Sequence, residues 1–183
     1  SGEITLAQAK DLTDHTNLST TTAIDFAGSI TGDSTDFYNG SAFTSNFLAV
    51  LGKDANPAVK LTNTVEDSTE VAALNALESG YGSQSGTSGV ITATVTGAAG
   101  TVKSVDVTTQ ALTFTVSSGT LTLAEVESIQ GTINANTLQL TGAAKVSDTL
   151  TAASSTKRTV LQNLSTGDNT APLTIDSGVI SSD

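Results

Sequence analysis

The chain has 183 residues, and the small residues Thr, Ser, Ala and Gly fill about half of its positions. It carries 18 acidic residues against 7 basic ones, which gives a net charge of −11 at neutral pH. Nucleic-acid binding requires a basic patch, so this balance excludes it, and it also disfavours binding to an anionic membrane surface. The chain has no Cys, which excludes disulfides, thiolate metal sites and cysteine nucleophiles.

The apolar residues are too scattered for a membrane span. The longest apolar run, residues 47–51, is far shorter than the ~20 residues that a spanning helix needs. Order is nevertheless expected, because the chain has only two Pro and many Val, Ile and Thr, which favour pleated strands. We therefore expect an ordered protein with a thin core and no membrane span.

Three segments share a pattern that predicts short helices, at residues 5–12, 69–77 and 122–129. In each segment apolar residues recur at every third or fourth position, which gives the helix one apolar face. Each segment also begins with Thr followed by Glu or Gln in the first turn, close to a capping box. Further helices are expected at residues 45–51 and 158–164.

Alternation of apolar and polar residues predicts strands between these helices. Residues 89–99 and 131–144 share Ile-x-Ala followed by Thr-Gly-Ala-Ala, which is the strongest internal identity in the chain. Residues 23–32 look like a degraded copy of this segment. Other strands are expected at residues 59–64, 102–108, 111–117 and 173–175.

The recurring elements predict a fold that is mainly β with short helices, built as an irregular β-solenoid or stacked repeat array. A unit of roughly 30–45 residues buries too little apolar surface alone, and stacked units share a core. We expect one repeat-built domain over residues 1–183, with approximate units at 4–44, 45–68, 69–121, 122–156 and 157–183.

The core of this domain should consist of rows of small and β-branched residues rather than aromatic clusters. The strand residues expected in it are Ile91, Val95, Ile133, Leu138 and Leu140. The helical residues Val71, Leu74 and Leu77 should face the same core.

Three short runs carry a resemblance to a known family. They are Ala-Leu-Asn-Ala-Leu at residues 73–77, Thr-Ser-Gly-Val-Ile-Thr-Ala at 87–93, and Val-Thr-Gly-Ala-Ala at 95–99. This pattern resembles the repeats of giant bacterial extracellular surface proteins of cyanobacterial type, adhesins related to RTX exoproteins. The resemblance covers residues 69–150, and residues 4–36 more loosely. It implies an extracellular structural or adhesive role and carries over no catalytic residues.

Two acidic tetrads are the candidate sites for ion binding. Asp33-Ser34-Thr35-Asp36 and Asp67-Ser68-Thr69-Glu70 each place acids and hydroxyls ahead of an apolar residue. Such residues suit helix N-termini, where they accept hydrogen bonds from the first backbone N–H groups. Clustered oxygen ligands also suit Ca²⁺, so capping and calcium binding both stay open. No other cofactor is expected.

The residues that usually carry catalysis are sparse. His15 is the single His and has no Gly-x-Ser-x-Gly elbow to act with, so we expect a surface residue near a helix end. With one Arg, no Trp and only Tyr38 and Tyr81, a carbohydrate-processing cleft is poorly supplied. The Gly- and Ser-rich run at residues 79–89 lacks the Lys-Ser/Thr of a phosphate loop and predicts a surface loop. We therefore expect no enzyme and assign no catalytic, cofactor-binding or metal-binding residue.

The function expected from these features is a structural or adhesive repeat segment of a secreted bacterial protein at the cell surface or outside the cell. Its partners would be neighbouring copies or repeats of the same protein and components of the cell surface or extracellular matrix. The first alternative is a self-assembling subunit of an extracellular fibre, sheath or surface layer. Further alternatives are a phage fibre or decoration protein and a polysaccharide-processing β-helix.

Overall fold

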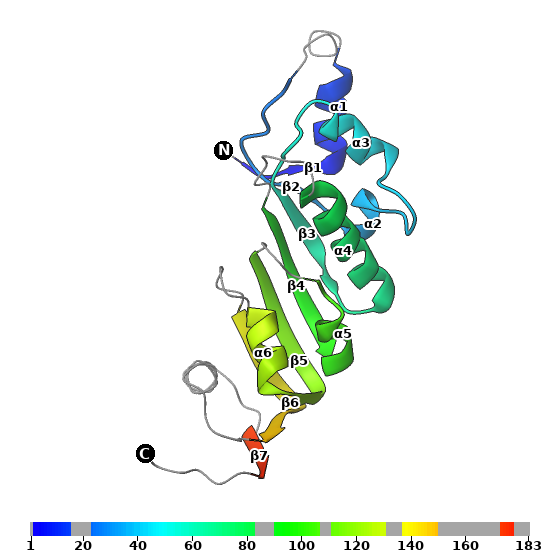
Figure 1. The fold of residues 1–183 in the computed structure, drawn as a ribbon. Coiled ribbons are helices and arrows are strands. Elements are labelled where there is room, and N and C mark those ends of the chain that lie inside the picture. The colour runs from blue at the N-terminus through cyan, green and yellow to red at the C-terminus, as the bar shows by residue number, and fades with distance from the viewer. Residues whose placement is uncertain are drawn as a thin grey trace. The chain divides into compact units, whose positions relative to one another are not determined.

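Strands alternate with helices along the chain, as in Rossmann-like α/β proteins (Figure 1). The computed structural model describes residues 2–15, 23–82, 90–106, 111–130, 137–149 and 173–177. The strands follow one another in the sheet in chain order, from β1 to β7. The pairs β1–β2, β2–β3, β5–β6 and β6–β7 are all parallel.

The protein is therefore an α/β fold with an open parallel sheet. The expected mainly β fold, an irregular β-solenoid or stacked repeat array, is wrong. Parallel neighbours need a long crossover to bring the chain back, and from β1 to β6 helices contribute to each of these connections. The short helices therefore form part of the connections of an α/β fold and are not additions to a β-solenoid.

The chain forms two compact units. The first comprises residues Ser1–Thr94 with Val105–Ala111, and the second comprises Val95–Ser104 with Leu112–Asp183. The elements of the first unit are β1 (Ile4–Thr5), α1 (Leu6–Asp14), β2 (Ile30–Gly32), α2 (Ser34–Phe37), α3 (Ser45–Leu51), β3 (Val59–Val65) and α4 (Ser68–Gly82). The next strand, β4 (Ile91–Ala98), begins in the first unit and ends in the second.

One backbone hydrogen bond recurs at the start of successive strands in the first unit. In each case the first strand residue donates its N–H to a carbonyl that precedes the next strand. The three bonds are Ile4 N–H to Ser29 O at 3.1 Å, Ile30 N–H to Ala58 O at 2.7 Å, and Val59 N–H to Val90 O at 3.0 Å.

These bonds align one apolar row across the strands. Ile4 pairs with Ile30, and Ile30 pairs in turn with Val59. Ile30 and Val59 are fully buried. Ile4 and Ile30 are separated by about as many residues along the chain as Ile30 and Val59. The expected boundaries of the repeat units are not tested by this pairing and stay a prediction.

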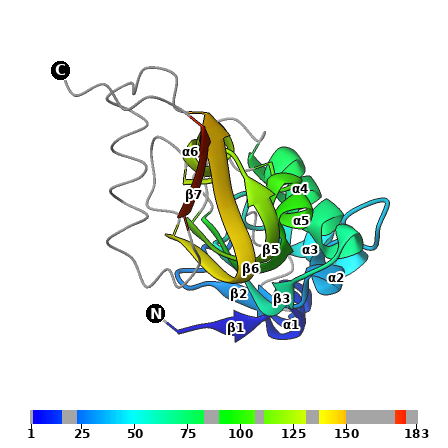
Figure 2. The same cartoon turned by 90° about the horizontal axis from the view of Figure 1, so that it is seen from below.

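The helices of the first unit cover the apolar face of its strands. In β3, Val59, Leu61 and Val65 are buried, whereas the intervening Thr62 is exposed. Helix α1 packs on α3, and α2 packs on both α4 and β3. Figures 1 and 2 show these four helices on one side of β2 and β3.

An aromatic cluster lies where α2 meets α3. Phe37 and Phe47 are fully buried and meet edge to face, with ring centroids 5.1 Å apart. Phe43 extends the cluster from Phe47 toward Tyr38, at centroid distances of 5.3 and 6.1 Å. The expectation of a core without aromatic clusters is therefore wrong for the first unit, because α2 and α3 meet through these rings.

The second unit repeats the parallel pairing. It contains α5 (Ala99–Lys103), β5 (Ala111–Leu121), α6 (Leu123–Gln130), β6 (Thr137–Thr149) and β7 (Leu173–Ser177), of which Ala111 alone falls in the first unit. Thr113 pairs with Thr137 on β6, and Val146 of β6 pairs with Leu173 on β7. The buried side chains Phe114 and Val116 lie beside Leu138 and Leu140, which continues the apolar rows.

Most local expectations are confirmed. Helices occur at the four expected places that the structure describes, as α1, α3, α4 and α6, and strands occur as β3, β4, β5 and β7. The expected core residues Val71, Leu74, Leu77, Ile91, Val95, Leu138 and Leu140 are all buried.

Other local expectations are wrong or fall outside the description. The strand expected at residues 102–108 is wrong at its start, because Val102 and Lys103 belong to α5. Within residues 23–32 only Ile30–Gly32 forms a strand. Ile133, the helix expected at residues 158–164 and the start of the segment at 131–144 lie outside the described residues.

A bulge in β6 depends on glycine. The pairing of β5 with β6 shifts between Val116 and Ser118, where β6 uses one residue more. Gly142 lies in this bulge with φ of +60°, a conformation that residues with a side chain rarely adopt. A Cβ atom there would lie only 2.9 Å from the carbonyl oxygen of Ser117.

We expect Gly142→Ala to lower the free energy of unfolding by about 1–3 kcal/mol, because it adds both backbone strain and a steric clash. The matched control is Gly100→Ala in α5, where a Cβ meets nothing within 4 Å. That control should be neutral or stabilising by up to about 1 kcal/mol. Urea denaturation of both variants makes the comparison, and equal effects would contradict the assigned role of Gly142.

A charged cap begins α6. The Thr122 hydroxyl accepts the N–H of Glu125 at 3.2 Å, and Glu125 Oε2 accepts the N–H of Thr122 at 2.7 Å. Lys103 Nζ lies 3.0 Å from Glu125 Oε1 and so joins α5 to α6. The backbone hydrogen bond from Thr122, aided by Lys103 and opposed by partial burial, holds the pKa of Glu125 below its ordinary value.

We expect Glu125→Gln to cost about 0.5–1 kcal/mol at pH 7, a small value because the two side chains of the ion pair are 38% and 34% exposed. A lowered folded-state pKa stabilises above the ordinary pKa, and this stability is lost as pH falls through the folded value. The variant and the parent should therefore converge in acid. Melting curves against pH test this, with Glu127→Gln on the same helix as the charge-matched control.

Candidate functional site

Several polar side chains of the first unit lie where its parallel strands end. β1, β2 and β3 are followed by α1, α2 and α4, so these helices begin at the carboxyl edge of the sheet. In open α/β sheets this edge is the usual place for a ligand. Both acidic tetrads lie there, one at the start of α2 and one at the start of α4.

The second tetrad caps α4. Asp67 Oδ1 accepts the N–H groups of Thr69 at 2.8 Å and of Glu70 at 2.9 Å. Glu70 Oε2 in turn accepts the N–H of Glu66 at 2.6 Å and of Asp67 at 3.3 Å. The expectation that these acids cap a helix is confirmed.

The first tetrad caps α2 in a similar way. Asp33 is the N-cap residue, and Asp36 Oδ2 accepts the N–H of Asp33 at 2.9 Å. The hydroxyl of Thr62, on the neighbouring strand β3, donates to Asp33 Oδ1. Capping is confirmed here too, and Asp33 is in addition tied to β3.

Asn63 joins the two tetrads. Its Oδ1 accepts the N–H of Ser34 at 2.9 Å, and its Nδ2 donates to the Ser34 hydroxyl at 3.3 Å. The same Nδ2 donates to Glu70 Oε1 at 2.8 Å. Because Ser34 is fully buried, Asn63 satisfies polar groups that have left water.

Sequence reasoning missed Asn63, although a signal was present. In β3 the alternate positions Val59, Leu61 and Val65 are buried and apolar, and Asn63 occupies the same series. A polar residue in the apolar series of a strand is expected to have specific partners inside the protein.

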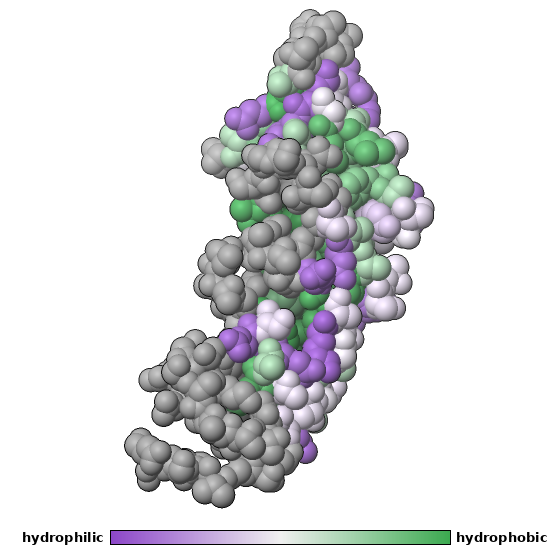
Figure 3. Space-filling model, in the orientation of Figure 1, coloured by the Kyte–Doolittle hydropathy of each residue, from purple (hydrophilic) through white to green (hydrophobic). Residues whose placement is uncertain are grey.

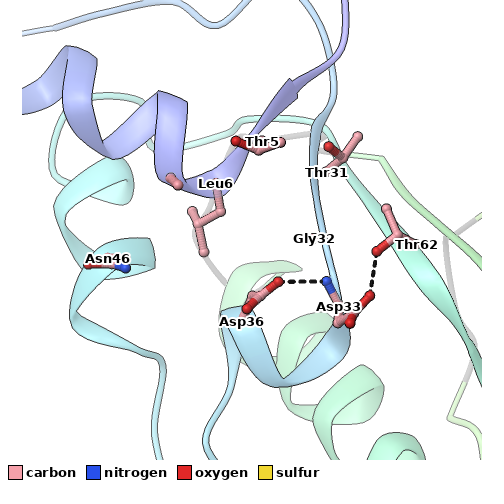
Figure 4. Close-up of a pocket in the computed structure, with 9 residues that line it drawn as sticks. Thr5, Leu6, Thr31, Gly32, Asp33, Asp36, Asn46 and Thr62 are labelled. Atoms are coloured by element: carbon pink, nitrogen blue, oxygen red, sulfur yellow. Dashed lines mark hydrogen bonds between the residues drawn. The ribbon is translucent and has the colours of Figure 1, made fainter.

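A surface pocket of about 340 Å³ opens beside the first tetrad (Figure 4). Its lining includes Leu6, Ala7, Thr31, Asp33, Asp36 and Asn46. These residues come from α1, β2, α2 and α3 and from the residue between β2 and α2. The lining combines carboxylate, amide and hydroxyl groups with an aliphatic side and contains no basic side chain.

The remaining candidate residues are dispersed. His15 caps the C-terminus of α1, with its N–H directed to the Leu12 carbonyl at 3.3 Å, as expected for a residue near a helix end. Tyr38 packs on Phe43, and Tyr81 lies near the end of α4. The surface loop expected at residues 79–89 is wrong at its start, since α4 runs to Gly82, and residues 83–89 lie outside the description.

Within the described ranges, no group of three or more His, Cys, Asp or Glu could hold a metal ion. The acids of both tetrads instead serve the helix caps, and calcium binding stays a prediction. In the same part of the chain, no helix combines the length and the apolarity that crossing a bilayer requires. Figure 3 shows hydrophilic and hydrophobic residues interleaved on the visible face.

The fold and this edge define an α/β protein whose strand ends are linked by capped helices and flanked by a polar pocket. Searches for a matching family model, for a similar curated protein and for a similar solved structure found none.

We expect Asn63→Ala to lower the free energy of unfolding by about 1–3 kcal/mol, because it leaves the N–H of buried Ser34 without its acceptor. The control is the neighbouring Thr64→Ala, which should change stability by less than about 0.5 kcal/mol. Chemical denaturation of both variants measures the difference. An Asn63→Ala loss as small as that of the control would contradict the linking role.

Proposed function

We propose that the chain is a structural, adhesive repeat segment of a secreted bacterial cell-surface protein. The observation that carries the proposal is the recurrence of one unit, in which a strand leads directly into a capped helix. Four such caps place the two capping residues three positions apart, at Thr5 and Gln8, Asp33 and Asp36, Asp67 and Glu70, and Thr122 and Glu125. A repeat segment requires such a recurring unit of local structure.

The surface chemistry is consistent with this role. On β4, Thr92 and Thr94 are exposed while the alternate residues Ile91, Ala93 and Val95 are buried. The polar side of this strand is thus hydroxyl-rich and uncharged. The net charge of −11 favours solubility and opposes non-specific association between copies.

At one edge of the sheet, β1 gives little support to the alternative of a fibre subunit assembled by strand addition. Assembly by strand addition needs unpaired backbone groups at an edge. β1 has two residues, and its Ile4 N–H donates to Ser29 O. The N–H of Thr5 donates to Gln8 Oε1 at 2.9 Å as part of the α1 cap. Both donors are engaged within the chain, so β1 offers little to a further strand.

The remaining alternatives have less support. A polysaccharide-processing β-helix requires a mainly β coil, which the α/β fold contradicts. A phage fibre or decoration protein shares the Thr-, Ser- and Gly-rich composition, and the described residues add nothing specific to it. The partners we propose are neighbouring repeats of the same protein and components of the cell surface or matrix.

Surface location is tested with antibodies raised against the purified chain. We expect them to label intact cells of the source bacterium and to lose their signal after external protease treatment. A cytoplasmic marker that stays protected controls for lysis. Label that appears only in permeabilised cells would overturn the proposal.

Negative-stain images of the purified chain should show monomers, and ordered fibres would favour the subunit alternative instead.

A further inference from the structure

We propose that the pocket beside Asp33 and Asp36 binds a neutral sugar residue. The inference deepens the adhesive part of the proposed function and rests on it for its biological setting. The chemistry of the binding itself is argued from the first unit alone, to which all residues of the pocket belong.

The lining has the two surfaces that a sugar ring requires. At the start of α1, the exposed Ala7 and the small accessible part of Leu6, which is only 4% exposed, give an aliphatic side against which the C–H face of a ring can pack. Asp33 and Asp36 lie across from Leu6, at the start of α2 (Figure 4). Small-molecule pockets typically pair apolar walls with a few polar groups that fix orientation, and their volumes begin near roughly 300 Å³.

The two carboxylates are positioned as acceptors for sugar hydroxyls. Asp33 accepts from the Thr62 hydroxyl and Asp36 accepts from the N–H of Asp33. These bonds fix both side chains, and an ionised carboxylate with about four lone-pair sites retains acceptor capacity. Hydrogen bonds from neutral hydroxyls to such charged acceptors are stronger than those between neutral groups.

Asn46 completes the polar side from a separate element. It lies on α3, its side chain is exposed, and it lines the pocket opposite the strand residue Thr31. Its amide can donate to a sugar oxygen and accept from a hydroxyl, whereas the carboxylates can only accept. The pocket therefore offers both kinds of hydrogen bond, as a polyhydroxylated ring demands.

The charge of the pocket excludes anionic ligands. Lys60 is the basic residue on the neighbouring strand β3, and its ammonium group pairs with Glu3 at 2.6 Å. Phosphate and acidic sugars would meet two carboxylates without a compensating cation in the lining, so a neutral sugar is favoured over either.

The experiment is an NMR titration of the ¹⁵N-labelled full chain with glucose, galactose, mannose and N-acetylglucosamine, and separately with calcium chloride. We expect at least one sugar to shift the amide signals of Ala7, Gly32 and Asp33 in a saturable way at millimolar concentrations. Shifts with calcium alone, or none with any sugar at tens of millimolar, would overturn the proposal.

Location is tested with Ala7→Trp, which fills the pocket from an exposed helical position. The chain offers a matched control in Ala124→Trp, because Thr-Leu-Ala opens both α1 and α6 and Ala124 is exposed as well. Ala7→Trp should weaken sugar binding roughly tenfold or more, and Ala124→Trp should leave it unchanged. Equal affinity in both variants would overturn the assigned location.

A further variant, Asn46→Ala, removes an exposed side chain and should also weaken binding without changing the melting temperature. Unchanged binding in Asn46→Ala would contradict its role in the pocket. Because these titrations use purified protein, their failure would leave the proposed surface location intact. Failure of the antibody labelling would in turn leave the sugar titration unaffected.

Discussion

The hydrogen bonds of Asn63 are the interaction on which the carboxyl edge of the first unit depends. A helix N-terminus leaves four N–H groups unsatisfied, and in this unit two helix N-termini meet beside one strand. Asn63 accepts from Ser34 at the start of α2 and donates to Glu70 at the start of α4. Because an unpaired buried polar group is costly, this arrangement ties both helices to β3. It also fixes the direction of α2 and hence the position of Asp33 beside the pocket.

Local structure could be predicted from the sequence where a short pattern decides it. The capping pairs and apolar spacing predicted α1, α4 and α6, and alternation predicted β3, β4 and β5. The fold class could not be predicted in this way. Alternation is typical of strands with one polar face, which are commonly antiparallel, and these strands are parallel with helices on their apolar side. The direction of pairing depends on crossovers that run from one strand through a helix to the next strand, and no local pattern extends over such a distance.

The sequence Thr-Gly-Ala-Ala occurs twice in the chain and adopts a different conformation each time. In the first copy β4 ends at Ala98 and helix α5 begins at Ala99. In the second copy the strand continues through Gly142, which takes a positive φ and opens a bulge. After the second copy the strand continues, and Val146 pairs with Leu121 of β5 on one side and with Leu173 of β7 on the other. The same four residues therefore adopt different conformations in the two copies, and Gly is compatible with both.

The pocket lies where the first unit departs from its pattern of one strand followed by one helix. β1 and β3 each lead into one longer helix, whereas β2 leads into the four-residue α2 and then α3. The segment that joins α2 to α3 is held by the aromatic cluster and by Asn39, whose Oδ1 accepts the N–H groups of Ser41 and Ala42. This segment brings Asn46 into the same pocket lining as Thr31, which the strand register places beside Thr5.

The sequence makes Asp33 a candidate calcium ligand because it belongs to an acidic tetrad. Its surroundings come from elements that are distant in the chain, since Thr62 on β3 donates to its carboxylate and Leu6 on α1 lines the same pocket. A hydroxyl donor fixes a carboxylate without neutralising it, so the charge of Asp33 remains available to a ligand that can donate hydrogen bonds. These surroundings make Asp33 an anchored acceptor in the lining of a pocket, which no short stretch of sequence could have indicated.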